Sequence, residues 1–245
     1  EHRKDCMAFI SPPIADTKNA ATPVANVLAY ENQLSASSYA SLDSGAVYVY
    51  DKYNDGFRYI GAAGLCAGLC ANTDQVADAW FSPAGVNRGQ LLGVAKLAHN
   101  PKTAERDELY VGKVNPIATF PGRGVVVFGQ KTLQQRQTAL DRVNVRRLLI
   151  SLKSFISQIS DNLVFEQNTV ATRNNFLTQV NPFLESVQQR QGLFAFKVTM
   201  DDTNNGPDVI DRNELRGAIF IQPVKAAEFI VLDFNVLPTG AEFPG

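Results

Sequence analysis

A run of apolar residues at three- and four-residue spacing constrains the fold of this chain more than any other feature. From Val145 to Ile159 the spacing predicts one long amphipathic helix that ends near Ser160, with Asp141 as its candidate N-cap. A helix with an apolar face of this length is stable only when that face is buried. The second half of the chain therefore contains a packed core.

The elements expected around this helix alternate in type. A second helical pattern follows, in which we expect Pro182 to kink or restart the helix and Gly192 to lie beyond its end. Alternating apolar residues at 194–200, at 219–221 and at 230–236 then predict strands. Helices packed on a sheet are the arrangement that this order favours.

The first half mixes helices and strands in the same way. Residues 6–10 read as a strand, and Thr22-Pro23 is a good start for a helix. Residues 46–50 and 57–60 flank Asn54-Asp55-Gly56, which predicts a hairpin. The small residues after Gly61 predict a closely packed helix.

These patterns predict an α/β (α+β) protein with two mixed-sheet domains and flanking helices. The Pro-containing loop that ends the segment KTAERDELYVGKVNPI has the composition of a boundary between structural units. We place the division between residues 1–112 and residues 113–245.

Composition excludes several classes of protein. Of the 245 residues 45% are hydrophobic and 19% are charged, with 23 Lys+Arg against 24 Asp+Glu, as in an ordinary globular protein. The formal charge of -1 argues against direct binding of nucleic acid through counterion release, which requires a basic face. No apolar run approaches the roughly 20 residues that cross a bilayer, so we expect no membrane insertion. Three cysteines, Cys6, Cys66 and Cys70, without a glycosylation acceptor favour a reducing compartment. We predict that Cys66 and Cys70 are buried free thiols.

One segment comes close to a phosphate-binding loop. Gly124-x4-Gly129-Gln130-Lys131-Thr132 approaches the GxxxxGK[ST] pattern, but one extra residue precedes the lysine. The intervening Val-Val-Val-Phe is typical of a buried strand. We therefore predict a core strand at this place, and a nucleotide-binding enzyme remains a distant alternative.

Two further patterns fall short of a metal site. Asp201 opens a calcium-like loop, but Arg212 stands where a bidentate glutamate is needed, so we predict a polar turn. Cys66 and Cys70 could share a helix face, but the chain has only two histidines to complete a zinc site. We predict no catalytic, cofactor-binding or metal-binding residues and no cofactor.

The long helix also carries basic residues on its predicted polar side. Arg142, Arg146 and Lys153 fall near one side when the apolar residues face inward. Such a face is usually solvated, but it can also dock on an acidic partner surface.

Longer stretches of the sequence carry a family resemblance. The chain resembles the contractile tail sheath proteins of myovirus-type (T4-like) bacteriophages, and the matching segments cover most of Arg3 to Phe234. They are RKDCMAFISPP, AWFSPAGVNRG, ERDELYVGKVNPI, FPGRGVVVFGQKTL, DRVNVRRLLISLKSFI, FEQN, NNFLTQVNPFLESVQQRQGLFAFKV and FIQPVKAAEFIVLDF.

This resemblance implies a structural subunit and not an enzyme. Sheath subunits form hexameric rings stacked helically around a tail tube, and they contract to drive the tube through the host envelope. The implied partners are other copies of the chain, the tail tube protein, and baseplate and tail terminator proteins. The implied location is the virion tail, after assembly in the host cytoplasm. The same sheath in a phage-derived particle, such as a tailocin or a type VI-like apparatus, is the close alternative.

The resemblance also divides the chain by role. Residues 1–112 would form a middle, peripheral domain, and residues 113–245 an inner domain with a C-terminal arm. Because sheath subunits are longer and this chain opens with Glu1, we expect a missing N-terminal region. We expect the tail beyond Pro238 to be a natural C-terminus. Arg142, Arg146 and Lys153 are candidates for contact with the tube or a neighbouring subunit. The expected inter-subunit strand and arm comprise Phe229, Val231, Asp233, Asn235, Leu237, Pro238, Thr239 and Gly240.

Overall fold

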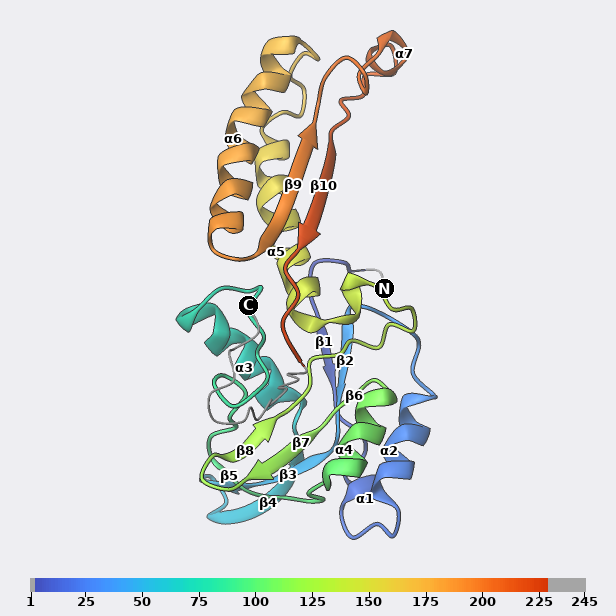
Figure 1. Ribbon diagram of the computed structural model, residues 1–245, viewed down its shortest axis with the longest axis vertical. Coiled ribbons are helices and arrows are strands. Elements are labelled where there is room, and N and C mark those ends of the chain that lie inside the picture. Colours follow the sequence, from blue (N-terminus) through green and yellow to red (C-terminus); the bar gives the residue numbers. More distant parts are fainter. Residues whose placement is uncertain (1–2, 229–245) are drawn as a thin grey trace, which may run out of the picture.

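The chain forms an elongated molecule of two units placed end to end (Figure 1). A computed structural model describes residues 3–228. The first unit contains three small sheets with the helices α1 to α4, and the second contains two long helices beside a two-stranded sheet. This arrangement confirms the predicted mixed α/β class.

The strands of the first unit form three separate sheets. The first sheet is parallel, in the order β1-β2-β6, and the second is antiparallel, in the order β4-β3-β5. The third is the antiparallel pair β7-β8. The bounds are β1 (Ala8–Ile10), β2 (Ala40–Asp43), β3 (Ala46–Asp51), β4 (Gly56–Gly61), β5 (Val94–Leu97), β6 (Val114–Asn115), β7 (Ile117–Phe120) and β8 (Gly124–Val127).

The hairpin predicted around Asn54-Asp55-Gly56 is confirmed. Strand β3 pairs with β4, with Val47 opposite Ile60, and Asp55 turns the chain with a φ of 45°. Asp and Asn tolerate this left-handed conformation better than most residues do. The Tyr48 and Tyr59 rings lie 4.6 Å apart across the pair, which adds aromatic packing to the backbone hydrogen bonds.

Four helices pack around these sheets. The predicted start of a helix at Pro23 is confirmed, and so is a helix over the small residues after Gly61. The expected close packing is wrong at Gly64 and Gly68, because a Cβ at either position would meet open space. The bounds are α1 (Ile14–Thr17), α2 (Pro23–Glu31), α3 (Ala63–Val76) and α4 (Thr103–Val111).

The first unit has two apolar clusters that meet at its sheets. One joins Leu42 and Val114 to helices α2 and α4, and the other joins Val47 and Val125 to helix α3. Strands β6 to β8 thus pack in the core of the first unit. Cys66 and Cys70 are buried free thiols, as predicted.

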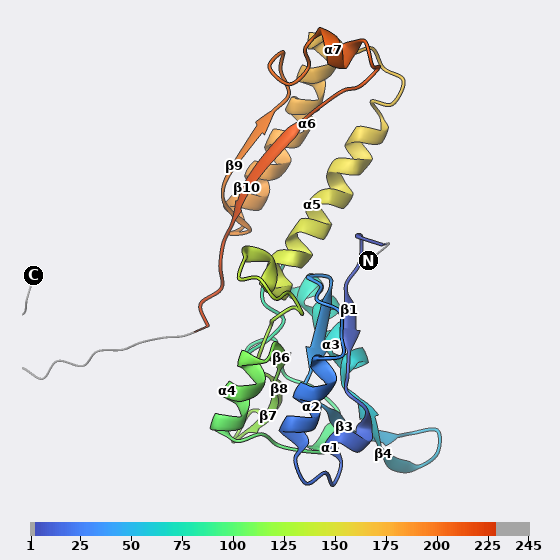
Figure 2. The same ribbon diagram turned by 90° about the vertical axis from the view of Figure 1, so that its right-hand side faces the viewer.

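The second unit is a pair of long helices covered by a hairpin (Figure 2). The helices contact each other, and strands β9 and β10 pair antiparallel beside α6. Its core includes Leu148, Val180 and Leu184, together with Trp80 from the loop after α3. The bounds are α5 (Val143–Asp161), α6 (Val170–Gln189), β9 (Leu193–Thr199), α7 (Pro207–Ile210) and β10 (Ala218–Pro223).

Two details of the long helices differ from the sequence prediction. Helix α5 begins after Arg142, and Asp141 is not its N-cap, because a short 3₁₀ turn, η1 (Ala139–Asp141), precedes it. Helix α6 continues through Pro182, so no second helix starts there. The strand predicted at 230–236 lies outside the described residues.

The two units are joined near the base of α5 and α6. The Trp80 indole donates a hydrogen bond of 2.9 Å to the backbone oxygen of Arg190. Arg147 and Arg190 form ion pairs of 2.5 Å and 2.7 Å with Asp74 and Asp78, which belong to α3 and the loop after it. The junction therefore combines apolar packing with ion pairs.

Candidate functional site

The segment after β10 returns from the second unit to the first (Figure 1). Its residue Glu228 lies in a cluster of polar side chains. Glu228 accepts hydrogen bonds from Arg142, at 2.6 Å from Nε and 2.9 Å from Nη2. Gln130 Nε2 donates to the same carboxylate at 3.3 Å, and the Tyr110 hydroxyl donates to its other oxygen. We call these four residues the Glu228 clasp.

Each member of the clasp comes from a different segment. Tyr110 lies in the last turn of α4, Gln130 follows β8, and Arg142 is the N-cap of α5. Lys131 supports the cluster, because its Nζ lies 3.7 Å from the centre of the Tyr110 ring and donates to the Tyr110 backbone oxygen at 2.5 Å. Side chains from α4, from the segment after β8 and from the start of α5 thus all bind the carboxylate of Glu228.

The electrostatics of the clasp favour the ionised carboxylate. Burial alone would raise the pKa of Glu228, but hydrogen bonds from Arg142 and Tyr110 and the charge of Arg142 lower it below its usual value. Burial and the hydrogen bond to Glu228 raise the pKa of Tyr110. The phenol therefore remains a hydrogen-bond donor at neutral pH, and the ion pair remains charged.

The basic residues predicted as an exposed face are placed differently. Arg142 points to Glu228 and also pairs with Asp141 at 3.0 Å. Arg146 is buried, stacks 4.0 Å from the centre of the Tyr39 ring and donates to Ser38. A basic outer face through Arg142 and Arg146 is therefore wrong, because the base of α5 is covered by the first unit.

Lys153 is the exposed member of the predicted basic set. The predicted inter-subunit residues all lie outside the described part of the chain. They are Phe229, Val231, Asp233, Asn235, Leu237, Pro238, Thr239 and Gly240.

The sequence patterns do not predict that Tyr110, Gln130 and Glu228 meet, and Gln130 stands out only within the near phosphate-binding pattern. The clasp joins positions 86 and 118 residues apart, and no periodicity within one element reveals such a contact. One signal was present: Glu228 is a carboxylate within the largely apolar run AAEFIV. A charge in such a run needs a partner when it is buried.

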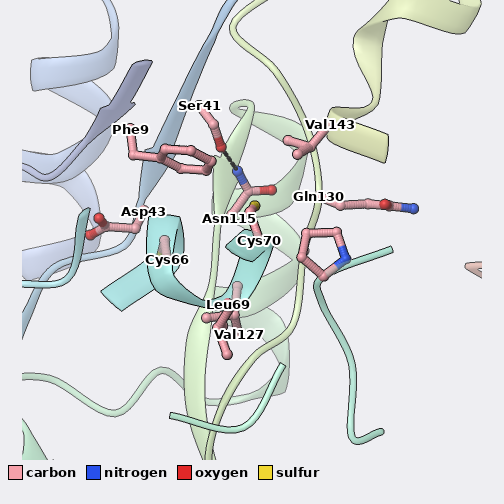
Figure 3. Close-up of a pocket in the computed structure, with 12 residues that line it drawn as sticks. Phe9, Ser41, Asp43, Cys66, Leu69, Cys70, Asn115, Val127, Gln130 and Val143 are labelled. Carbon is pink, nitrogen blue, oxygen red and sulfur yellow. Dashed lines mark hydrogen bonds between the residues drawn. The ribbon is translucent and has the colours of Figure 1, made fainter. Parts of the chain in front are cut away.

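A small cavity lies between the first sheet and α3 (Figure 3). Its volume of about 30 Å³ accommodates water but no nucleotide. Asn115 crosses its wall and donates to Ser41 Oγ at 2.9 Å and to the backbone oxygens of Leu42 and Lys131 at 3.1 Å and 2.8 Å. In return, the Lys131 amide donates to Asn115 Oδ1 at 2.6 Å.

The segment that approaches a phosphate-binding loop is part of this framework. Val125, Val126 and Val127 are buried in β8, and Thr132 is fully buried and donates through its hydroxyl to the Leu140 backbone oxygen. The Lys131 side chain is directed at Tyr110. The predicted core strand is confirmed.

The calcium-like loop is the polar turn that the sequence predicts. Asp201 Oδ1 accepts a hydrogen bond of 2.9 Å from the Thr203 amide. Asn205 donates to the backbone oxygens of Asp201 and Arg216 at 3.1 Å and 2.8 Å, and its Oδ1 accepts from the Arg216 amide at 2.8 Å. Across residues 3–228 no three His, Cys, Asp or Glu side chains gather as a metal site. Within the same range no helix is long and apolar enough to span a membrane.

Asp43 is a buried carboxyl beside the cavity. It is 4% exposed, and it accepts hydrogen bonds from the Ser11 hydroxyl and from the Gly45 amide at 2.9 Å. Burial raises the pKa of Asp43 from 3.8 to about 7, although both hydrogen bonds act in the opposite direction. The folded chain therefore retains a proton that the unfolded chain loses above about pH 4.

We expect Asp43 to make stability depend on pH. The free energy of unfolding should fall by about 4 kcal/mol as the pH rises from about 4 to about 8, because the shift of about three pKa units corresponds to about 1.4 kcal/mol per unit. The Asp43→Asn variant should lack this contribution, which urea unfolding of both proteins from pH 4.5 to 8 would measure. Parallel stability curves for the two proteins would contradict the assignment.

Family comparisons match the chain in two consecutive parts. The family described as "Phage tail sheath protein central domain" matches residues 1–133. The family described as "Phage tail sheath C-terminal domain" matches residues 135–237. Their meeting point falls between β8 and α5, close to the Glu228 clasp.

The curated relatives that match the chain are named tail sheath proteins. The tail sheath protein of Vibrio phage KVP40 is 42% identical over 256 residues, and that of Enterobacteria phage T4 is 40% identical over 254 residues. Each alignment covers 98% of this chain and 38% of the relative. The chain thus spans less than half of the length of these relatives.

Solved structures share the fold. The sheath complex of an extracellular contractile injection system, PVC, in its contracted state has a TM-score of 0.81 at 22% identity, covering 93% of this chain and 63% of that chain. The contracted helical sheath of the anti-feeding prophage has a TM-score of 0.76 at 21% identity, covering 94% and 61%. The resemblance seen in the sequence segments is confirmed: the chain belongs to the phage tail sheath protein family.

Proposed function

We propose that this chain is the part of a contractile tail sheath subunit that joins neighbouring subunits around a tail tube. In this proposal the subunits form stacked hexameric rings, and their contraction drives the tube through the host envelope. The observation that carries the proposal is the match of both sheath domain families, in order, to residues 1–133 and 135–237. Family membership points to a structural role and not to catalysis.

The physical basis is a repeated head-to-tail contact. Such a contact generates a helical filament when its rotation does not close into a small ring. We propose that the C-terminal strand and arm, from Phe229 to Gly240, pair with the sheet edge of a neighbour. Backbone pairing of this kind survives the exchange of weaker side-chain contacts between two discrete states.

We further propose a division of labour between the two units. The second unit would be the inner domain that carries the arm, and the first unit would be peripheral. The packing of β6 to β8 in the first unit favours a division after residue 133 over one at residue 112, and the two matched families meet at the same place.

The source of the related sequences favours a phage tail over a phage-derived particle. The relatives reported above are phage tail sheath proteins, and the injection-system sheaths share the fold at lower identity. We propose the virion tail as the location of the protein, after assembly in the host cytoplasm. The tail tube, baseplate and tail terminator proteins are the proposed partners.

Electron microscopy of the full-length protein that contains this sequence tests the proposal. Expressed alone and concentrated, it should form long, uniform tubes in negative stain. Discrete monomers at several salt concentrations, even after addition of the tube protein, would overturn it. Saturable binding of ATP in a titration would instead favour the nucleotide-binding alternative.

Lys153 remains the exposed candidate for contact with the tube or a neighbour. We expect Lys153→Glu to reduce the amount of assembled sheath about two- to tenfold, because reversing a charge at an interface opposes association. Sedimentation of assembled tubes measures the effect, and Lys52→Glu in the β3–β4 turn is the matched control. Equal assembly of both variants would remove Lys153 from the contact.

A further inference from the structure

We propose that the Glu228 clasp sets the direction in which the C-terminal arm leaves the subunit. The inference rests on the proposed function, in which residues after Glu228 pair with a neighbouring subunit. Glu228 and Arg142 are then positioning residues, which act on assembly by determining where the arm can reach.

The first argument is the way the segment before Glu228 is attached. Val224 donates a backbone hydrogen bond of 3.2 Å to the Gly192 oxygen. From Lys225 to Ala227 the side chains are exposed, and in the described chain these three residues form no backbone hydrogen bond outside the regular elements. The side chain of Glu228 is therefore the main anchor of this segment.

The second argument is the geometry of the anchor. Arg142 binds the two carboxylate oxygens through two different nitrogens, Nε at 2.6 Å and Nη2 at 2.9 Å. A bidentate pair fixes the plane of the carboxylate, whereas one hydrogen bond would leave it free to rotate. The side chains of Arg142 and Glu228 are 26% and 17% exposed, so water competes weakly for these bonds.

The third argument is where the partners originate. Tyr110 and Gln130 belong to the central-domain match, and Arg142 belongs to the C-terminal-domain match. Glu228 is thus bound to both domains at once. A change in the angle between the domains would have to break or redirect these hydrogen bonds, which couples the direction of the arm to the state of the subunit.

Open space surrounds the anchor on two sides. One groove of about 530 Å³ runs from the clasp past Arg88 and Phe128, and a second of about 560 Å³ runs past Gln137 and Lys225. The segment from Lys225 to Glu228 therefore lies beside these two grooves and is not packed into a core. Releasing Glu228 would free the segment without opening either domain.

The test uses the full-length protein with variants of the clasp. We expect Glu228→Gln and Arg142→Lys to raise the concentration needed for tube formation at least tenfold, because Glu228→Gln removes the charge of the carboxylate and Arg142→Lys removes the bidentate geometry. The monomer should keep its thermal unfolding temperature within a few degrees. Tyr110→Phe should have a smaller effect, since it removes a single hydrogen bond.

A matched control separates the clasp from a general loss of charge. Glu214→Gln removes an exposed carboxylate that pairs with Arg216 at 2.7 Å, outside the clasp. It should leave tube formation unchanged. An equal effect of Glu214→Gln and Glu228→Gln would overturn the proposal.

A second measurement reports on the arm without requiring assembly. Spin labels at Ala227→Cys and Ser157→Cys, in a Cys6→Ser background, give the distance between the segment and helix α5. The distribution should be narrow in the parent and broad after Glu228→Gln. An unchanged distribution would overturn the clasp. A narrow parent distribution without tubes would contradict the proposed function and leave the clasp intact.

Discussion

Removing residues 237–245 from the full-length protein is expected to abolish helical tubes and to leave the monomer folded. Among residues 3–228, which the structure describes, the apolar clusters of both units contain residues up to Ile221, and the deletion removes none of these side chains. It removes part of the strand and arm that we propose to pair with a neighbour. If about four backbone hydrogen bonds are lost at roughly 1 kcal/mol each, the association constant falls by about a thousandfold.

Negative-stain microscopy measures whether tubes form, and thermal unfolding measures whether the monomer remains folded. Glu242→Gln is the control, because it changes a charge in the same stretch but retains the backbone. Tubes formed by the truncated protein would contradict the arm. Loss of the folded monomer would show instead that these residues belong to the fold of the subunit.

Asn115→Ala is expected to lower the free energy of unfolding by about 4–6 kcal/mol. Asn115 is 3% exposed and joins β2, β6 and the backbone of Lys131 through four hydrogen bonds. Alanine supplies neither donor nor acceptor, so several buried groups lose a partner at about 1–3 kcal/mol each. The added cavity increases the loss.

Urea unfolding measures this loss, with Asn54→Ala as the control. Asn54 makes a single side-chain bond, of 2.7 Å to Asp51, at an exposed turn, and its removal should cost less than about 1 kcal/mol. A similarly small loss for Asn115→Ala would mean that water extends from the neighbouring cavity and replaces the amide.

The second unit could largely be predicted from the sequence because its signals are local. The spacing of Leu148, Leu152 and Ile159 marks the buried face of α5, and the turn Asn54-Asp55-Gly56 marks the hairpin of the first unit in the same way. Both depend on residues close in the chain. Long elements with one exposed side are predicted well from the spacing of their apolar residues.

The parallel sheet and the clasp could not be predicted in this way. Strand β2 has the sequence ASLD, with two polar residues, and it is a strand because β1 and β6 pair with it on both sides. From Val143 to Leu148 every residue of α5 is buried, since both units enclose its base. A prediction from apolar periodicity assumes that the opposite face of the helix is exposed to solvent. At a domain junction this assumption fails, because both faces are buried. The prediction that Arg146 lies on an exposed basic face is wrong for this reason.

The enclosed base of α5 gives the long helix the mechanics of a lever. Its 19 residues span about 28 Å, and its first two turns are held by the packing and ion pairs of the junction. A rotation of about 10° at the base would move the far end by about 5 Å, nearly the pitch of one helical turn. Small repacking around Trp80 and Arg147 would thus be amplified into a displacement large enough to exchange one set of neighbour contacts for another.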